Sequence, residues 1–307
     1  MGHGHGHGMP RGTASYAHRR RMVAVLAILV VIMAVEVVGA LISGSLALFA
    51  DAGHMLADGL GVALALLATT VAARPASTAR TFGWQRAEIL AALTNGVVVA
   101  VIGVLAIVVG VRRLADPGEI ETGIMLAVAV VGLAGNLGGL LLLRSGQRHS
   151  LNVRGAYLEV LGDTLGSVAV VGAAVVIMTT GWVRADAAAS VLIGLMILPR
   201  AWLLLRDVLD VLLEATPKGV DLEDVRRHML EAPGVVDVHD LHAWTITSGV
   251  PVLSAHVVIA ESAEPGCGAD SVLDGLHRCL AGHFDIEHST FQIEPMGHVE
   301  HEHAAHP

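Results

Sequence analysis

The sequence predicts an α-helical membrane protein with six membrane-spanning helices, followed by a small α+β domain. Hydrophobic residues make up 54% of the 307 residues and charged residues only 15%, a composition typical of polytopic membrane proteins. The charge is also unevenly divided: residues 1–205 hold 14 Arg/Lys and 10 Asp/Glu, whereas residues 206–307 hold 5 and 18. A slightly basic membrane part is therefore followed by an acidic, water-soluble part. Neither part has the clustered basic face that nucleic-acid binding needs.

Six apolar segments predict the membrane helices, and each has the roughly 20 residues needed to cross a bilayer. The first is too long for the apolar region of a signal peptide and has no small-residue cleavage site. In chain order, the segments are 22–42, 46–72, 87–111, 122–143, 155–179 and 183–205. Asp186 follows Arg184 at the start of the last segment, and we expect it to cap that helix.

The arginines predict the orientation in the membrane, because positively charged loops stay in the cytoplasm. Both termini should be cytoplasmic, which makes the chain an integral, multi-pass protein of the cytoplasmic membrane. The arginines on the cytoplasmic side are Arg19, Arg20, Arg21, Arg74, Arg80, Arg86, Arg144, Arg148, Arg154, Arg200 and Arg206.

The acidic tail predicts the element order α-β-β-α-β. Helical periodicity covers 221–231 and 271–282, and strand patterns cover 235–247, 250–260 and 290–294, with a turn at Ser248-Gly249 between the first two strands. This order suits a small sheet with helices on one face. A core this small is marginal, so we expect dimerisation to stabilise it.

These patterns divide the chain into four parts. They are a His-rich cytoplasmic tail (1–21), the membrane domain (22–205), a cytoplasmic regulatory and dimerisation domain (206–297) and a His-rich end (298–307). We expect disorder at both ends, although the alternating Gly-His start also fits an engineered tag. The two cysteines, Cys267 and Cys279, make no disulfide framework and should stay reduced in the cytoplasm. We expect Cys279 to be buried on its helix.

Two pairs of side chains inside the spans indicate a metal site. His54 and Asp58, and likewise Glu159 and Asp163, are four residues apart and so share one face of a helix. Ionisable groups at membrane depth are costly and by default mark an ion or proton path. Four such ligands could enclose one divalent cation, and imidazole with carboxylate suits Zn²⁺. The alternative is that the carboxylates pair with each other or with Arg, but we expect no Arg or Lys close to them within the spans.

Metal binding at this site should be linked to protons. Three carboxylates close together repel one another when ionised, so we expect some to carry protons until a metal displaces them. Asp51 lies one turn before His54, and Ser167 lies one turn after Asp163; either could orient a ligand or relay protons. The other polar groups of the spans, Glu36, Asn95 and Asn136, are expected to hydrogen-bond between helices.

The tail carries a second set of His and acidic residues. The turn between its first two strands could bring them together as a cytoplasmic metal site, whereas the alternative is surface histidines on a soluble domain. The set is His239, His242, His256, His288 and Glu294.

These residues resemble the cation diffusion facilitator family over nearly the whole chain. The resemblance rests on Ser45–Asp58, Thr81–Leu90, Val238–Trp244, Leu253–His256 and His288–Glu294. It implies a homodimer of six-helix protomers with a ferredoxin-like cytoplasmic domain. It also implies zinc efflux by proton antiport through a site on spans 2 and 5, which His54, Asp58 and Asp163 match directly. The Zn²⁺ would be cargo and also regulatory in the tail, and no organic cofactor is expected.

Two features depart from the family pattern. The zinc-exporting branch usually has His where this chain has Glu159, and carboxylate favours harder cations than imidazole does. Cd²⁺, Co²⁺, Fe²⁺ and Mn²⁺ are therefore further candidate substrates. Residues 74–86 contain no His, Asp or Cys, so we predict that the metal site of some relatives in this loop is absent.

A transporter would not be an enzyme. Three other functional classes compete with this hypothesis. A membrane metal sensor without transport would leave the two intramembrane pairs unexplained. An intramembrane metalloenzyme would need a nucleophile or general base beside His54, and the sequence offers no His-Glu-x-x-His pattern there. A channel would need weaker binding than a closed four-ligand site provides.

Overall fold

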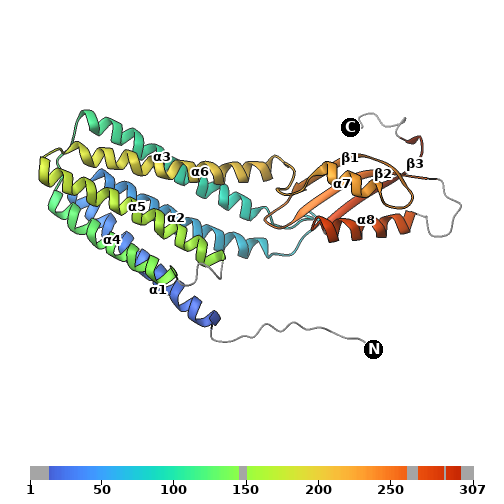
Figure 1. Ribbon diagram of the computed structural model, residues 1–307, viewed down its shortest axis with the longest axis horizontal. Coiled ribbons are helices and arrows are strands. Elements are labelled where there is room, and N and C mark those ends of the chain that lie inside the picture. The colour runs from blue at the N-terminus through green and yellow to red at the C-terminus, as the bar shows by residue number, and fades with distance from the viewer. Residues whose placement is uncertain (1–13, 145–150, 261–268, 287, 299–307) are drawn as a thin grey trace. The chain divides into compact units, whose positions relative to one another are not determined.

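The computed structural model describes residues 14–144, 151–260, 269–286 and 288–298. Within them, six helices are long and apolar enough to cross a membrane, which confirms the predicted spans (Figure 1). They are α1 (Ala14–Ser43), α2 (Leu46–Ala72), α3 (Ala87–Ala115), α4 (Thr122–Arg144), α5 (Leu151–Thr180) and α6 (Arg184–Leu212).

Two helix ends differ from the expectation. Helix α1 begins at Ala14, so part of the segment predicted to be disordered is helical. Helix α6 continues to Leu212, past the predicted end at residue 205. Both extensions consist partly of charged residues. A prediction from hydropathy stops at these residues, although the helical backbone continues through them. The remaining His-rich residues of the predicted tails, apart from His298, lie outside the described residues.

The described chain divides into two compact units, residues 1–62 with 95–202 and residues 63–94 with 203–307. In the first unit, α4 packs against α1 and α5. Small residues allow these close approaches: a Cβ at Gly39 or Gly135 would overlap side chains across the α1–α4 interface, and one at Gly103 would lie 2.9 Å from Leu198 of α6. The core of this unit is built from aliphatic and small residues, among them Leu48 and Met125.

The start of α2 is fixed by a buried carboxylate from another helix. Asp186 of α6 accepts hydrogen bonds from Ser45 Oγ (2.5 Å), Leu46 N (2.8 Å) and Ala47 N (3.1 Å). Ser45 Oγ in turn accepts from Leu48 N at 3.2 Å. The expectation that Asp186 caps its own helix is therefore wrong: it caps α2. The sequence shows a capping side chain but not which helix end lies beside it.

The tail confirms the order α-β-β-α-β. It consists of α7 (Leu222–Leu230), β1 (Val235–Thr245), β2 (Pro251–Ile259), α8 (Ala269–His283) and β3 (His288–Pro295). The described strands form one sheet in the order β1-β2-β3, antiparallel between β1 and β2 and parallel between β2 and β3.

The alternation of side chains along β2 separates the two faces of this sheet. Leu253, Ala255 and Val257 pack into a core with Met229 of α7 and Leu276 of α8. The residues between them on β2, including His256, point to the opposite face. That face carries the polar residues described below.

Candidate metal sites

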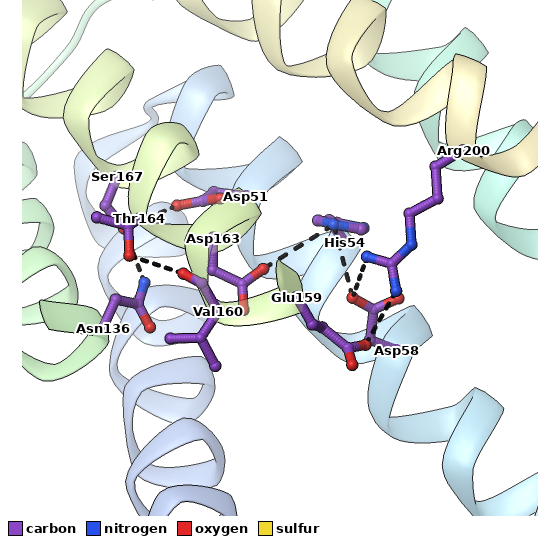
Figure 2. Close-up of polar contacts among 10 residues, drawn as sticks. All are labelled: Asp51, His54, Asp58, Asn136, Glu159, Val160, Asp163, Thr164, Ser167 and Arg200. Carbon is purple, nitrogen blue, oxygen red and sulfur yellow. Dashed lines mark hydrogen bonds and ion pairs between the residues drawn. The ribbon is translucent and has the colours of Figure 1, made fainter. Parts of the chain in front are cut away.

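Two helices bring the predicted intramembrane ligands together. His54 and Asp58 lie one turn apart on α2, and Asp163 of α5 faces them (Figure 2). His54 Nε2 lies 3.5 Å from Asp58 Oδ2 and 3.9 Å from Asp163 Oδ1. One possible ligand atom from each residue lies within 4.8 Å of the other two. His54 and Asp163 are buried, so the group lies inside the helical bundle.

This geometry fits a divalent cation of the size of zinc. Zinc holds nitrogen and oxygen donors at about 2.0–2.2 Å, which separates neighbouring donors by roughly 3.4 Å in a tetrahedron. The two distances from His54 Nε2 are close to that value, so a small movement of the side chains would complete a three-ligand site. Such a site replaces part of the hydration shell that a bare ion must lose to enter hydrocarbon.

The fourth predicted ligand, Glu159, is not part of this three-residue group, although its side chain lies beside Asp58. Its Oε1 is 3.2 Å from Nη2 of Arg200 on α6, and Arg200 Nη1 is 3.8 Å from Asp58 Oδ2 (Figure 2). The expectation that no Arg lies near these carboxylates within the spans is therefore wrong. The sequence predicts Arg200 at the cytoplasmic end of span 6, but α6 continues for three more turns, to Leu212. No sequence signal indicates that this side chain reaches α2 and α5.

Behind the three ligands, a chain of buried polar groups links three helices. Asn136 Nδ2 of α4 donates to Ser167 Oγ of α5 at 3.1 Å, and Ser167 Oγ lies 3.4 Å from Asp51 Oδ2 of α2. A Cβ at Gly166 would overlap the Asp51 carboxylate. The expected interhelical role of Asn136 is confirmed, while the expectation that Asp51 or Ser167 orients a ligand or relays protons stays a prediction.

Glu36 of α1 is fully buried beside these groups. A Cβ at Gly132 of α4 would overlap its Oε1, and neither carboxylate oxygen has a hydrogen-bond partner among the described residues. The expected interhelical hydrogen bond of Glu36 is thus absent from the described part of the chain. Close approach to Gly132 holds the side chain in place instead.

The tail gathers a second group on the face of its sheet opposite the core with α7 and α8. His239 of β1 and His256 of β2 are register partners, and Glu294 of β3 lies beside them. His256 Nδ1 is 2.8 Å from Glu294 Oε1, and His239 Nε2 is 3.5 Å from Glu294 Oε2. Each of the three offers one ligand atom within 4.8 Å of the others. Antiparallel and parallel pairing thus bring together residues from both ends of the domain.

The other two residues of the predicted cytoplasmic set are not part of this three-residue group. The register shifts after His239, and Asp240 has a positive φ of 50°, which marks a β-bulge. His242 is exposed and lies 3.1 Å from Asp240 Oδ1. His288 packs edge-on against Phe82, with ring centroids 5.5 Å apart. The bulge also aims Asp240 at the group, 3.7 Å from His256 Nε2, a position that strand alternation cannot reveal.

Comparison with known proteins decides the family. Residues 22–213 match the model described as the cation efflux transmembrane domain, and residues 217–296 match the model of the cation efflux protein cytoplasmic domain. The chain belongs to the cation efflux, or cation diffusion facilitator, family. The resemblance stated above is thereby confirmed, and with it the fold of six apolar helices followed by a small cytoplasmic domain.

Several members of the cation efflux family are similar over most of this chain. It is 45% identical over 294 residues to the metal cation efflux system protein CzcD of Cupriavidus metallidurans, covering 96% of this chain and 90% of that one. It is 42% identical over 277 residues to the zinc transporter ZitB of Escherichia coli, covering 90% and 87%. It is 39% identical over 268 residues to the cadmium, cobalt and zinc/H(+)-K(+) antiporter of Bacillus velezensis, covering 87% and 85%.

In this member of the family, the described cysteine is only half-buried. Cys279 Sγ of α8 lies 3.7 Å from His283 Nδ1. Partial burial, and next the charge of Glu231, raise the pKa of the Cys279 thiol. Little reactive thiolate is therefore present at neutral pH. The expectation that Cys279 is buried on its helix is wrong in degree, because the side chain is of intermediate exposure, and Cys267 lies outside the described residues.

Proposed function

We propose that the chain exports divalent transition metal ions, Zn²⁺ foremost, from the cytoplasm in exchange for protons. The observation that carries this proposal is the convergence of His54, Asp58 and Asp163 from two apolar helices, within 4.8 Å of one another. Charged and metal-ligating groups at this depth are costly and by default mark an ion or proton path. The names of the relatives, which include zinc transport and antiport, support the same substrate class.

The proton coupling follows from the charge of the site. Without a metal, Asp58 and Asp163 share a water-poor space with a neutral imidazole, so a proton on either carboxylate lowers their mutual repulsion. A divalent ion displaces those protons when it binds. Release of the metal on the outer side and uptake of protons there would reset the site. The helices would alternate between inward- and outward-open states around it.

Three further parts of the proposal concern the whole assembly. The chain would be an integral protein of the cytoplasmic membrane with both termini in the cytoplasm, because its arginines favour that side. It would act as a homodimer through its tail domain. A second Zn²⁺ at His239, His256 and Glu294 would regulate transport. Occupancy of this site would follow the cytoplasmic Zn²⁺ concentration, and the bound metal would stabilise the packing of the tail.

The test is proton flux that depends on the metal. The purified chain in liposomes with an internal pH dye should move protons when Zn²⁺ is added to one side only, and Cd²⁺, Co²⁺, Fe²⁺ and Mn²⁺ would define its range. A chain that binds Zn²⁺ but moves neither metal nor protons would instead be a sensor, and would contradict the transport proposal.

A further inference from the structure

The pair of Glu159 and Arg200 has a consequence for how the proposed site selects its ion. Glu159 was expected to be the fourth ligand, on the same face of α5 as Asp163. In the structure its carboxylate is 3.2 Å from the Arg200 guanidinium instead. The group that could hold a metal comprises His54, Asp58 and Asp163, without Glu159.

The exposure of these side chains shows where Arg200 lies in the site. The exposed fraction falls from 52% for Arg200 and 33% for Glu159 to 16% for Asp58 and 4% for Asp163. A guanidinium facing hydrocarbon is costly, so we expect the exposed side of Arg200 to face water and an opening of the site. An ion that enters from this side meets Arg200 before it meets the ligands.

The charges of the site can be counted in two sets, and Arg200 contacts a carboxylate of each. Asp58 and Asp163 together carry the two negative charges that neutralise a divalent ion, with His54 as a neutral third ligand. Glu159 is neutralised by Arg200. Arginine suits this role because its guanidinium is a fixed, permanently charged fork that can contact two carboxylates at once. It does so here, since Nη1 lies 3.8 Å from Asp58 Oδ2.

We infer that Arg200 is a positioning residue that holds Glu159 out of the ligand set, so that His54, Asp58 and Asp163 bind the ion. This inference rests on the proposed transport function and deepens it. The tethered cation keeps binding moderate, because it removes one anionic ligand and repels the ion from the opening. Moderate binding allows release on the far side, which a transporter needs and a storage site does not.

The same pair also sets the metal preference. A carboxylate favours harder cations than imidazole does. While Arg200 holds Glu159, the ion meets two carboxylates and one imidazole. If Arg200 is removed, Glu159 becomes available as a third carboxylate, and Mn²⁺ should gain more affinity than Zn²⁺. The broader metal range expected from Glu159 alone is therefore restrained by a residue on another helix.

The test is a double-mutant cycle on zinc affinity, measured by competition with a chelator dye on the purified full chain. Arg200→Gln should bind Zn²⁺ roughly tenfold tighter, the size of one interaction with a charged group. Glu159→Gln should bind roughly tenfold more weakly, because Arg200 is then left with Asp58 as its partner. The double variant should return to within about threefold of the native chain, since the net charge of the pair is conserved.

The decisive result is the ratio of Mn²⁺ to Zn²⁺ affinity in the double variant, because loss of the Arg200 charge acts equally on two ions of the same charge. If Glu159 is held out of the ligand set, this ratio stays as in the native chain. If Glu159 is a direct ligand, losing its carboxylate lowers the ratio, and the inference is overturned even if Arg200→Gln alone fails to fold. Arg206→Gln removes the same charge from an exposed position of the same helix and should leave zinc affinity unchanged. A native, folded chain that neither binds nor moves Zn²⁺ would refute the proposed function instead, so the two failures are distinguishable.

Discussion

Removing the Asp186 carboxylate tests how the helix that carries His54 and Asp58 is anchored. Asp186 is buried and accepts hydrogen bonds from Ser45 Oγ and from the backbone nitrogens of Leu46 and Ala47. The Asp186→Ala change leaves these donors without their acceptor. Each unsatisfied buried donor costs about 1–3 kcal/mol. The variant no longer has to bury a carboxylate, and this gain offsets part of the summed cost of the donors.

We therefore expect Asp186→Ala to lower the free energy of unfolding by about 3–5 kcal/mol, a large share of the roughly 5–15 kcal/mol that stabilises most proteins. Asp186→Asn keeps an acceptor oxygen but loses the charge, so its loss should be about 1–2 kcal/mol. Ser45→Ala removes the hydroxyl that accepts from Leu48 N and should cost about 1 kcal/mol.

The assay is unfolding of the purified chain in mixed micelles by SDS titration, followed by circular dichroism. Asp207→Ala serves as the control, because Asp207 is an exposed carboxylate on the same helix that pairs with the exposed Lys218. It should change stability by less than about 0.5 kcal/mol. A loss below about 1 kcal/mol for Asp186→Ala would show that its three contacts do not anchor α2, and the reasoning would be refuted.

Three further predictions concern the metal sites and the cysteine. Glu159→His should raise the preference for Zn²⁺ over Mn²⁺ in vesicle uptake, because a neutral imidazole does not form the ion pair with Arg200, can join the ligands and is softer than carboxylate; identical metal profiles for the two proteins would contradict this. His256→Ala should lower the zinc bound per chain by one at equilibrium dialysis, and unchanged stoichiometry would remove the tail site. In a Cys267→Ser chain, maleimide labelling of Cys279 should be slow at pH 7 and rise with pH beyond 9, because burial and Glu231 raise the thiol pKa; a plateau by pH 8 would refute it.

The membrane helices could be predicted from sequence because hydropathy and helix length act locally. The segment 46–72 was predicted with both ends as the structure has them, and the i,i+4 spacing of His54 and Asp58 already placed both on one face. The same local rule placed Glu159 beside Asp163 on α5. In each case the information lies within a single helix.

Contacts between distant helices could not be predicted in this way. Arg200 reaches Glu159 across 41 residues of sequence and Asp186 reaches Ser45 across 141, and both partners depend on how α6 packs. In the tail, the bulge at Asp240 changes which side chains point at the metal group, because one extra residue reverses the alternation of a strand. Local patterns therefore predict the elements and the ligand types, whereas packing decides which ligands meet.

The central claim is that the ion crosses through His54, Asp58 and Asp163. The most direct measurement is the initial rate of Zn²⁺ uptake into liposomes driven by a pH gradient, compared between the native chain and Asp163→Asn, which removes the charge at nearly constant shape. Asp274→Asn, at an exposed position of α8, is the matched control. The account predicts gradient-dependent uptake in the native and control chains and at least a tenfold loss in Asp163→Asn, about the effect of one charged ligand. Uptake by Asp163→Asn at the native rate would contradict it.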